Sequence, residues 1–270
     1  MKTAEPLYII GDIHGQYEQL VGLLRGAGLV DARLAWSGGA ARVWFMGDFF
    51  DRGPAGVDTV DMVMRLQVES AQAGGSVGAL IGNHEPLILS AHRFSEQRTA
   101  WGGTFLWDWR RNGGDDAELE RLTPSHVEWL ASLPAMALVG DLLLVHADST
   151  FYSSYGSTID EVNQAFRELL RSDDAAAWDR LLEQFSQRKA FIDEDPDGAA
   201  RAAQMLTDFG GKQIVHGHTP INFILRCLPE EVVEPLVYAG GLCVNVDGGM
   251  YMGGPGFVYQ PSRATAAIEQ

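Results

Sequence analysis

Short apolar runs alternate along the chain with longer stretches in which apolar residues recur every three or four positions. The runs predict five buried strands, at residues 7–10, 43–46, 77–81, 142–145 and 213–215. After the first run, Leu20, Leu23 and Leu24 lie at helical spacing within residues 16–28, and helical spacing also follows the second and third runs. A repeated order of strand, polar loop and helix is typical of parallel βαβ units. The pattern therefore predicts an α/β fold.

Two longer stretches interrupt this order, and we expect both to be helical insertions. They lie near residues 94–132 and 151–209. In the first of them, Thr123 followed by Pro124 is typical of a helix start, because threonine caps free N–H groups and proline suits the first turn. No stretch has the composition of a linker. We therefore predict one domain over residues 1–270.

The second half of the chain is expected to contain a β-hairpin and several short strands. Residues 135–139 and 142–145 flank Gly140 and Asp141. Glycine next to aspartate between two apolar runs favours a tight hairpin. Short strands, separated by turns at pairs of glycines, are predicted from residue 212 to residue 259.

The composition excludes several kinds of partner. The chain has 270 residues, of which 46% are apolar and 21% charged, as in soluble globular proteins. Its net charge of −16 repels nucleic-acid backbones and anionic lipids. No apolar run approaches the ~20 residues that span a bilayer, and no signal-peptide pattern precedes the first strand. We therefore expect a cytoplasmic protein that binds neither nucleic acid nor membranes, with Cys227 and Cys243 as free thiols.

Blocks of potential metal ligands follow the apolar runs. They are GDIHG at 11–15, GDFFDRG at 47–53, NHE at 83–85, His146 and HGH at 216–218. Because the carboxyl ends of neighbouring parallel strands meet at one crevice, we expect these blocks to converge there. Their carboxylate, imidazole and amide groups suit a pair of divalent transition ions, with Mn, Fe, Zn or Co favoured over Ca or Mg. Five of the seven histidines fall in these blocks, which argues against a purely structural role.

Six of these residues are candidate ligands: Asp12, His14, Asp48, Asn83, His146 and His218. Asp12 and His14 are two positions apart, so at the end of an extended strand they point to the same side and suit one ion. Asp48 follows the next strand, and its two carboxylate oxygens can bridge two ions. Two neighbouring ions would lower the pKa of a shared water and offset the charge of a phosphoryl group.

Three further residues are candidate catalytic groups. His84 directly follows a candidate ligand, so its ring is expected to lie beside the ions rather than on them. Asp51 can accept the other ring proton of His84, and the pair is then a general acid for a leaving-group oxygen. The planar guanidinium of Arg52 suits phosphate oxygens.

These motifs resemble those of the calcineurin-like metallophosphoesterases, and within them the phosphoprotein phosphatase branch of serine/threonine phosphatases and bacterial diadenosine tetraphosphatases. The matching blocks are GDIHGQ, GDFFDRG, GNHE, LLLVHA, VHGHTP and VNVDGG, which run in the family's order from residue 11 to residue 249. The resemblance implies an α/β sandwich of two sheets flanked by helices, with a dinuclear metal site at the carboxyl ends of the strands. It also implies direct attack of a metal-bound hydroxide on phosphorus.

The resemblance further implies a role for each matching residue. One metal is bound by Asp12, His14 and Asp48, and the second by Asp48, Asn83, His146 and His218. His84 with Asp51 matches the family's acid pair, and Arg52 its phosphate-binding arginine. The family's second phosphate-binding arginine falls in a region that matches poorly and is expected to be helical, where Arg188 is the candidate.

Two positions leave questions open. His216 lies two residues before His218 and could compete for the ligand role, although the Thr219-Pro220 that follows favours His218. Asp148 stands where the family usually has glycine, and it adds charge near the pocket.

We therefore expect a phosphoric ester hydrolase that uses two divalent metal ions, manganese above others. Its predicted substrates are phosphoserine or phosphothreonine in proteins or peptides, or small phosphate esters. The glutamate of GNHE and the acidic exterior favour this function. The alternative is a dinucleoside polyphosphate hydrolase, in which Arg110 and Arg111 would bind the longer phosphate chain and Trp107 or Trp109 would stack on a base. A catalytically inactive scaffold disagrees with the intact ligand set.

Overall fold

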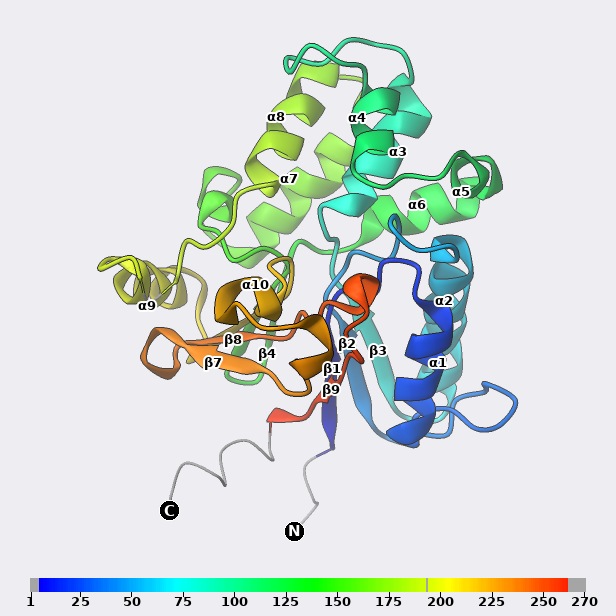
Figure 1. The fold of residues 1–270 in the computed structure, drawn as a ribbon, viewed down its shortest axis with the longest axis vertical. Coiled ribbons are helices and arrows are strands. Elements are labelled where there is room, and N and C mark those ends of the chain that lie inside the picture. The colour runs from blue at the N-terminus through cyan, green and yellow to red at the C-terminus, as the bar shows by residue number, and fades with distance from the viewer. Residues whose placement is uncertain (1–4, 193, 262–270) are drawn as a thin grey trace.

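Two β-sheets pack against each other at the centre of the fold. The computed structural model describes residues 5–192 and 194–261. Helices surround the sheets in this part of the chain (Figure 1). The predicted α/β fold with two sheets flanked by helices is therefore confirmed.

The first sheet has the strand order β3-β2-β1-β9. Its strands are β1 (Leu7–Ile10), β2 (Arg42–Phe45), β3 (Ser76–Ala79) and β9 (Val258–Tyr259). The first three are parallel, and β9 pairs antiparallel with β1. Helices α1 (Tyr17–Gly26) and α2 (Gly56–Gln72) connect the parallel strands, as the pattern predicts. The loops that follow these three strands consequently lie along one edge of the sheet.

The second sheet has the order β4-β5-β6-β8-β7. Its strands are β4 (Met136–Val139), β5 (Leu142–Val145), β6 (Gln213–His216), β7 (Leu236–Tyr238) and β8 (Cys243–Asn245). The three central strands are parallel and the two outer strands antiparallel. The predicted hairpin at Gly140 and Asp141 is confirmed, since Val139 pairs with Leu142 across it.

Apolar side chains from both sheets form one buried layer between them. The layer contains Ile9, Met46, Leu80, Val139, Leu144, Val215, Val244, Val246 and Tyr259. Full burial of one aliphatic side chain contributes ~1.5–3 kcal/mol to the free energy of unfolding. The layer therefore holds the two sheets firmly against each other. The loops at their carboxyl ends are positioned accordingly.

Helices cover the outside of the sandwich and one of its ends (Figure 1). The remaining α-helices are α3 (His84–Phe94), α4 (Phe105–Arg111), α5 (Asp116–Arg121), α6 (Pro124–Ser132), α7 (Ile159–Arg171), α8 (Ala175–Phe185), α9 (Gly198–Phe209) and α10 (Ile221–Leu225). Short 3₁₀ turns are η1 (Phe151–Ser154), η2 (Pro229–Glu231), η3 (Ala239–Gly241) and η4 (Met250–Met252). Both segments predicted as insertions contain helices. Within the described residues, no helix has the length and apolar character that crossing a membrane requires.

The third helix, α3, begins at His84, inside the NHE block. The reason is a contact between distant parts of the chain. The first N–H groups of a helix lack partners within it, and here the N–H of His84 donates to Asp48 Oδ1 at 2.9 Å. A local pattern of apolar residues contains no information about such a partner.

Candidate active site

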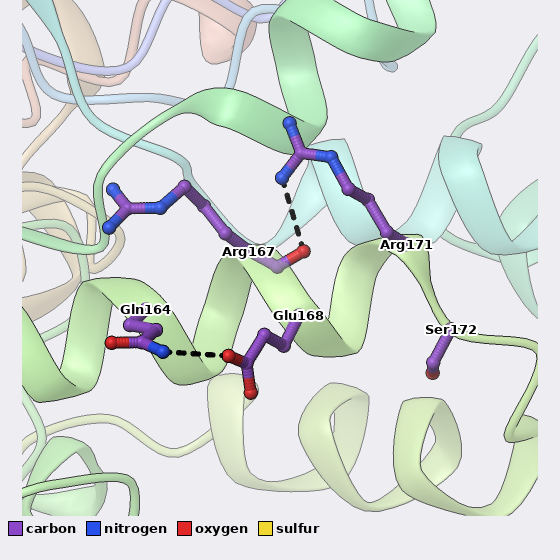
Figure 2. Close-up of a pocket in the computed structure, with 5 residues that line it drawn as sticks. All are labelled: Gln164, Arg167, Glu168, Arg171 and Ser172. Atoms are coloured by element: carbon purple, nitrogen blue, oxygen red, sulfur yellow. Dashed lines mark hydrogen bonds between the residues drawn. The ribbon is translucent and has the colours of Figure 1, made fainter.

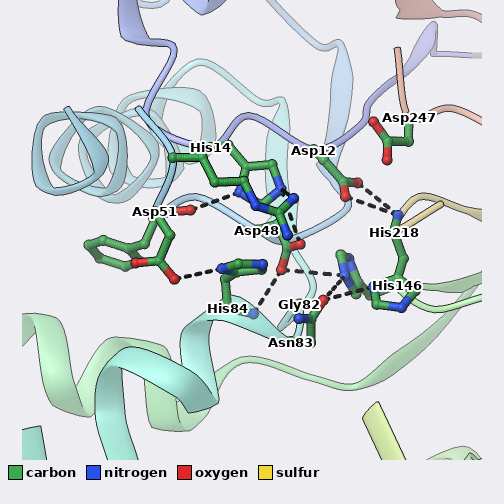
Figure 3. Close-up of polar contacts among 12 residues, drawn as sticks. Asp12, His14, Asp48, Asp51, Gly82, Asn83, His84, His146, His218 and Asp247 are labelled. Atoms are coloured by element: carbon green, nitrogen blue, oxygen red, sulfur yellow. Dashed lines mark hydrogen bonds and ion pairs between the residues drawn. The ribbon is translucent and has the colours of Figure 1, made fainter. Parts of the chain in front are cut away.

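The candidate residues converge where the loops at the carboxyl ends of the parallel strands meet, at the seam between the two sheets (Figure 3). The first sheet contributes the loops after β1, β2 and β3, and the second those after β5 and β6. Each of the following side chains is at most 4% exposed: Asp12, His14, Asp48, His84, His146 and His218. The structure thus places these groups in one buried cluster.

Within the cluster, two groups of three side chains have the spacing of metal ligands. The first contains His14, Asp48 and His84, and the second contains Asp48, His146 and His218. In each group, one ligand atom per residue lies within 4.8 Å of the others. Asp48 belongs to both groups, which is the position that a bridging carboxylate requires.

The two other candidate ligands lie against the second group. Asn83 Oδ1 is 3.1 Å from His146 Nε2 and 2.8 Å from His218 Nδ1. Both carboxylate oxygens of Asp12 accept hydrogen bonds from the backbone N–H of His218, at 3.1 and 3.0 Å. All six predicted ligands are therefore brought together, although Asp12 lies outside the two groups of three.

The chemistry of these donors fits a pair of cations. The buried atoms His218 Nε2 and Asp247 Oδ2 have no hydrogen-bond partner in the structure, and Asp247 lies beside Asp12 (Figure 3). Burial, together with Asp247, raises the pKa of Asp12 well above its ordinary value. Burial opposes charge on His146, yet the carboxylates of Asp48 and Asp12 raise its pKa to about 10. A proton on His146 thus offsets the negative charge of these carboxylates. Bound cations would provide that positive charge instead.

Backbone strain is concentrated at this cluster. Ten residues other than glycine have positive φ in the described part of the chain. Five of them are candidate site residues: His14, Asp48, Asp51, Arg52 and His218. Side-chain-bearing residues adopt this conformation at a cost, and such residues gather at functional sites where surrounding contacts hold them. The cluster also leaves no room for a side chain at position 82, because a Cβ on Gly82 would lie 2.2 Å from Asp48 Oδ1.

His84 and Asp51 form a buried pair beside the cluster. His84 Nδ1 and Asp51 Oδ2 are 2.6 Å apart. Burial lowers the pKa of His84 to about 3 and raises the pKa of Asp51 well above its ordinary value. The neutral form of the His84 ring is therefore favoured at neutral pH in this state. Donation to a leaving group requires a second proton, which the negative charge of a bound phosphate ester would favour.

Arg52 is exposed, but its guanidinium is directed at the cluster. Its Nη1 lies 2.9 Å from His14 Nε2, and its Cζ lies 4.4 Å from the centre of the Tyr251 ring. Stacking on an aromatic face keeps a guanidinium in place without using its hydrogen-bond donors. Arg52 can therefore offer these donors to a phosphate.

Arg188 lies in the loop between α8 and α9, inside the helical insertion expected at residues 151–209. The helix before it ends at Phe185. Burial lowers the pKa of His218 well below its ordinary value, and the positive charge of Arg188 contributes to this shift as well as to that of His84. The exposed Arg188 thus adds positive charge near these two histidines.

The structure distinguishes His218 from His216. The ring of His216 is engaged on both sides: Nδ1 lies 3.0 Å from the Gly217 carbonyl and Nε2 lies 2.7 Å from the Tyr238 hydroxyl. The backbone then turns, with φ of 67° at His218, so the two histidines do not share a strand face. Only His218 joins the ligand groups.

The side chains proposed for a longer phosphate chain have other partners. Arg110 makes two hydrogen bonds of 2.8 Å to Asp116. The guanidinium of Arg111 lies 4.5 Å from the centre of the Trp107 ring. Binding of a polyphosphate by Arg110 would compete with its hydrogen bonds to Asp116, whereas the stacked Arg111 keeps its donors free.

A surface hollow of about 480 Å³ lies on α7, apart from this cluster (Figure 2). It is lined by Gln164, Arg167, Glu168, Arg171 and Ser172. Gln164 donates a 2.8 Å hydrogen bond to Glu168, and the Ser172 hydroxyl donates one to the Leu169 carbonyl. None of the candidate residues lies there, so we place no activity in it.

Comparison with known proteins identifies the family. The family model described as calcineurin-like phosphoesterase matches residues 5–244. The chain belongs to this family. The resemblance inferred from the motifs is thereby confirmed.

Two kinds of relatives are similar to part of this phosphoesterase. Shewanella-like protein phosphatase 2 of Arabidopsis thaliana is 37% identical over 81 residues, which are 30% of this chain and 21% of that protein. The symmetrical bis(5'-nucleosyl)-tetraphosphatase of Escherichia coli (strain K12 / DH10B) is 32% identical over 83 residues, 31% of this chain and 25% of that protein. The matched stretches thus span only about a fifth to a quarter of these relatives.

Two solved structures show the same fold. The cold-active protein-tyrosine phosphatase of a psychrophile Shewanella sp. has a TM-score of 0.70 and 22% identity, with 95% of this chain and 75% of that chain covered. A protein serine/threonine phosphatase from Saccharomyces cerevisiae has a TM-score of 0.59 and 16% identity, with 95% and 72% covered. At such identities the likeness concerns the fold alone.

Glu85 is a buried residue to which the sequence analysis assigned no place in the site. Its carboxylate accepts three backbone N–H groups, from Asp48 at 2.9 Å, Phe49 at 2.8 Å and Gly82 at 2.6 Å. Burial, and after it the charge of Asp48, raises the pKa of Glu85 to about 7. Glu85 therefore fixes the loops after β2 and β3 in this phosphoesterase. Its place in the GNHE block is the signal that could have indicated this.

Trp109 is a second residue whose role emerges only from the structure. It is fully buried, and its indole N–H donates to Asp51 Oδ1 at 2.7 Å. Asp51 thus binds His84 through one oxygen and Trp109 through the other. The alternative function expected from the sequence made Trp109 a possible base-stacking group, and a buried indole cannot stack on a substrate's base.

Replacing Trp109 with phenylalanine is expected to lower turnover of a phosphopeptide roughly tenfold, the effect of removing one hydrogen bond to a charged group. The ring would still fill the core, while Asp51 would lose the partner that orients it. Steady-state kinetics together with metal analysis would measure the effect. Trp107→Phe, at an exposed position on the same helix, is the matched control. Equal turnover of the two variants would refute this role of Trp109.

Proposed function

We propose that this phosphoesterase is a metal-dependent serine/threonine protein phosphatase. The observation that carries the proposal is the buried cluster in which Asp48 belongs to both donor groups and the His84–Asp51 pair stands next to it. Such a cluster, with Arg52 directed toward it, suits the transfer of a phosphoryl group to water.

We assign the six ligands to two cations as the family motifs imply. Asp12, His14 and Asp48 would bind one, and Asp48, Asn83, His146 and His218 the other. The mixture of nitrogen and oxygen donors favours manganese, with iron, zinc or cobalt as other candidates. When bound, the cations would lower the pKa of a water and offset the negative charge of the phosphoryl group.

The remaining residues bind and orient the substrate. Arg52 and Arg188 donate hydrogen bonds to the phosphoryl oxygens, which gain charge in the transition state. His84 donates a proton from Nε2 to the leaving oxygen, and Asp51 stabilises the ring by accepting its Nδ1 proton. Because the cluster is buried, these electrostatic interactions are stronger than they would be in water.

A phosphorylated protein or peptide is the substrate that the surface suits best. The net charge of −16 attracts segments with basic residues around the phosphorylated side chain. The similarity to Shewanella-like protein phosphatases supports this choice. The similarity to symmetrical bis(5'-nucleosyl)-tetraphosphatases supports the alternative, hydrolysis of diadenosine tetraphosphate. The pairing of Arg110 with Asp116 favours the former.

A parallel assay with Mn²⁺ tests the proposal. We expect kcat/KM for phosphoserine or phosphothreonine peptides to exceed that for diadenosine tetraphosphate by about tenfold or more. Phosphotyrosine peptides and p-nitrophenyl phosphate complete the panel, and a chelator should remove all activity. A preference for the dinucleotide would favour the alternative. Full activity after removal of metal would reject both.

A further inference from the structure

Asp148 is a buried carboxylate that connects separate loops at the edge of the site. It lies two residues after His146 and is 1% exposed. Its Oδ1 accepts a hydrogen bond from the Thr219 hydroxyl at 2.7 Å, and its Oδ2 accepts one from the backbone N–H of Lys189 at 2.8 Å. The side chain thereby joins the loops after β5 and β6 to the segment between α8 and α9.

The segment that carries Arg188 is fixed by further contacts on both sides. The backbone carbonyl of Asp148 accepts the N–H of Ala190 at 2.9 Å. On the other side, the Ser149 hydroxyl donates to Gln187 Oε1 at 3.2 Å. Residues 187–190 are therefore anchored to the loop that follows β5 although their side chains are mostly exposed.

The backbone of this segment is strained at Lys189, whose φ is 66°. A residue with a side chain adopts this conformation only where its surroundings hold it. The contacts that do so are the hydrogen bonds from Lys189 and Ala190 to Asp148. Without the Asp148 carboxylate, the segment loses the hydrogen bond that holds Lys189 at positive φ.

Lys189 directly follows Arg188. The contacts that hold the backbone of Lys189 therefore also hold the Cα atom of Arg188 in place. Because Asp148 lies two residues after His146, its hydrogen bond to Lys189 places Arg188 at the edge of the cluster. Burial, and to a smaller extent the positive charge of Arg188, lowers the pKa of His84 and of His218. Arg52 approaches the same cluster from the loop after β2. The two arginines thus belong to opposite sheets, and only Arg188 depends on a long loop for its placement.

We propose that Asp148 is a positioning residue that holds Arg188 where its guanidinium binds the phosphoryl oxygens of the substrate together with Arg52. The inference rests on the proposed function and adds to it the group that orders the second arginine. A loop ordered in advance loses less conformational freedom when the anion binds, which strengthens binding. Glycine, usual at this position among the proteins that the motifs resemble, offers no such acceptor.

Binding of inorganic phosphate to the full chain loaded with Mn²⁺, measured by calorimetry, tests the proposal. Asp148→Ala removes the acceptor, and Lys189→Pro removes the donor and excludes positive φ. Each should weaken phosphate binding about tenfold, as should Arg188→Ala, because a charge-assisted hydrogen bond is lost. Combining Asp148→Ala with Arg188→Ala should cost no more than Arg188→Ala alone, since both act through one guanidinium.

Two conservative variants separate positioning from other effects. Asp148→Asn keeps an oxygen acceptor for the Lys189 N–H and should retain phosphate affinity within about twofold. Lys189→Ala keeps the donor and removes the amino group, and it should do the same. If Asp148→Ala fails to fold, Lys189→Pro, at an exposed position, tests the same hydrogen bond. Metal content should stay unchanged in every folded variant.

Additive losses in the double variant would overturn the proposal, because Asp148 would then act independently of Arg188. Equal losses in Lys189→Ala and Lys189→Pro would also overturn it, because the lysine charge would be responsible. Unchanged phosphate affinity in Asp148→Ala and Lys189→Pro, with normal wild-type hydrolysis, would reject the role of Asp148 alone. Failure of the wild-type protein to hydrolyse any phosphate ester would instead reject the proposed function.

Discussion

Replacement of Asp48 with asparagine is expected to lower turnover by at least about 10³-fold, because the charge stabilisation that metal ions supply amounts to several kcal/mol. Asp48 is the residue common to both donor groups. An amide in its place retains an oxygen that can accept the His84 N–H but removes the negative charge shared by two cations. Bound metal should therefore fall below two ions per chain, as elemental analysis of the dialysed protein would show.

Asp141→Asn provides the matched control for this experiment. The same chemical change at Asp141 falls at an exposed site, where water screens the ion pair with Lys212. We expect wild-type metal content and turnover in this variant. If Asp48→Asn bound two metal ions and turned over substrate at the wild-type rate, the assignment of Asp48 as a shared ligand would be wrong.

His84→Asn is expected to lower kcat on phosphopeptides by about 10²–10⁴-fold, the usual contribution of a positioned general acid. The loss should be much smaller for p-nitrophenyl phosphate, whose leaving group needs little protonation. Metal content should remain normal, because His84 Nδ1 is engaged by Asp51. A plot of kcat against the pKa of the leaving group for both proteins would measure the difference in slope.

His92→Asn is a suitable control, since His92 is exposed on the same helix, α3. It should leave both substrates unaffected. The assignment would be contradicted if His84→Asn slowed good and poor leaving groups by the same factor. Loss of bound metal in His84→Asn would instead favour His84 as a ligand, as its membership of the first donor group allows.

Much of the fold and the location of the site followed from local features of the sequence. The runs of apolar residues mark strands because both faces of a central parallel sheet are buried. The polar blocks mark the site because parallel strands align their carboxyl ends. Both arguments need only a few neighbouring residues, and the structure brings the predicted ligands together accordingly.

Other features depend on contacts between distant segments, and no local pattern contains them. The hydrogen bond from Trp109 to Asp51 spans 58 positions and exists only because α4 packs beside the loop after β2. The choice between His216 and His218 depends on the positive φ of His218, which alternation along a strand does not predict. The loop that contains Arg188 is bound through the backbone N–H of Lys189 to Asp148, which lies 41 positions earlier.

The position of the cluster at the seam between the sheets has a consequence for how the protein matures in the cell. Asp12 and His218 meet although they are 206 positions apart. A growing chain on the ribosome consequently presents only isolated half-sites until β6 has been synthesised and has docked in the second sheet. Since cations bind tightly only to a completed ligand set, metallation would be a late event, after most of the polypeptide has folded.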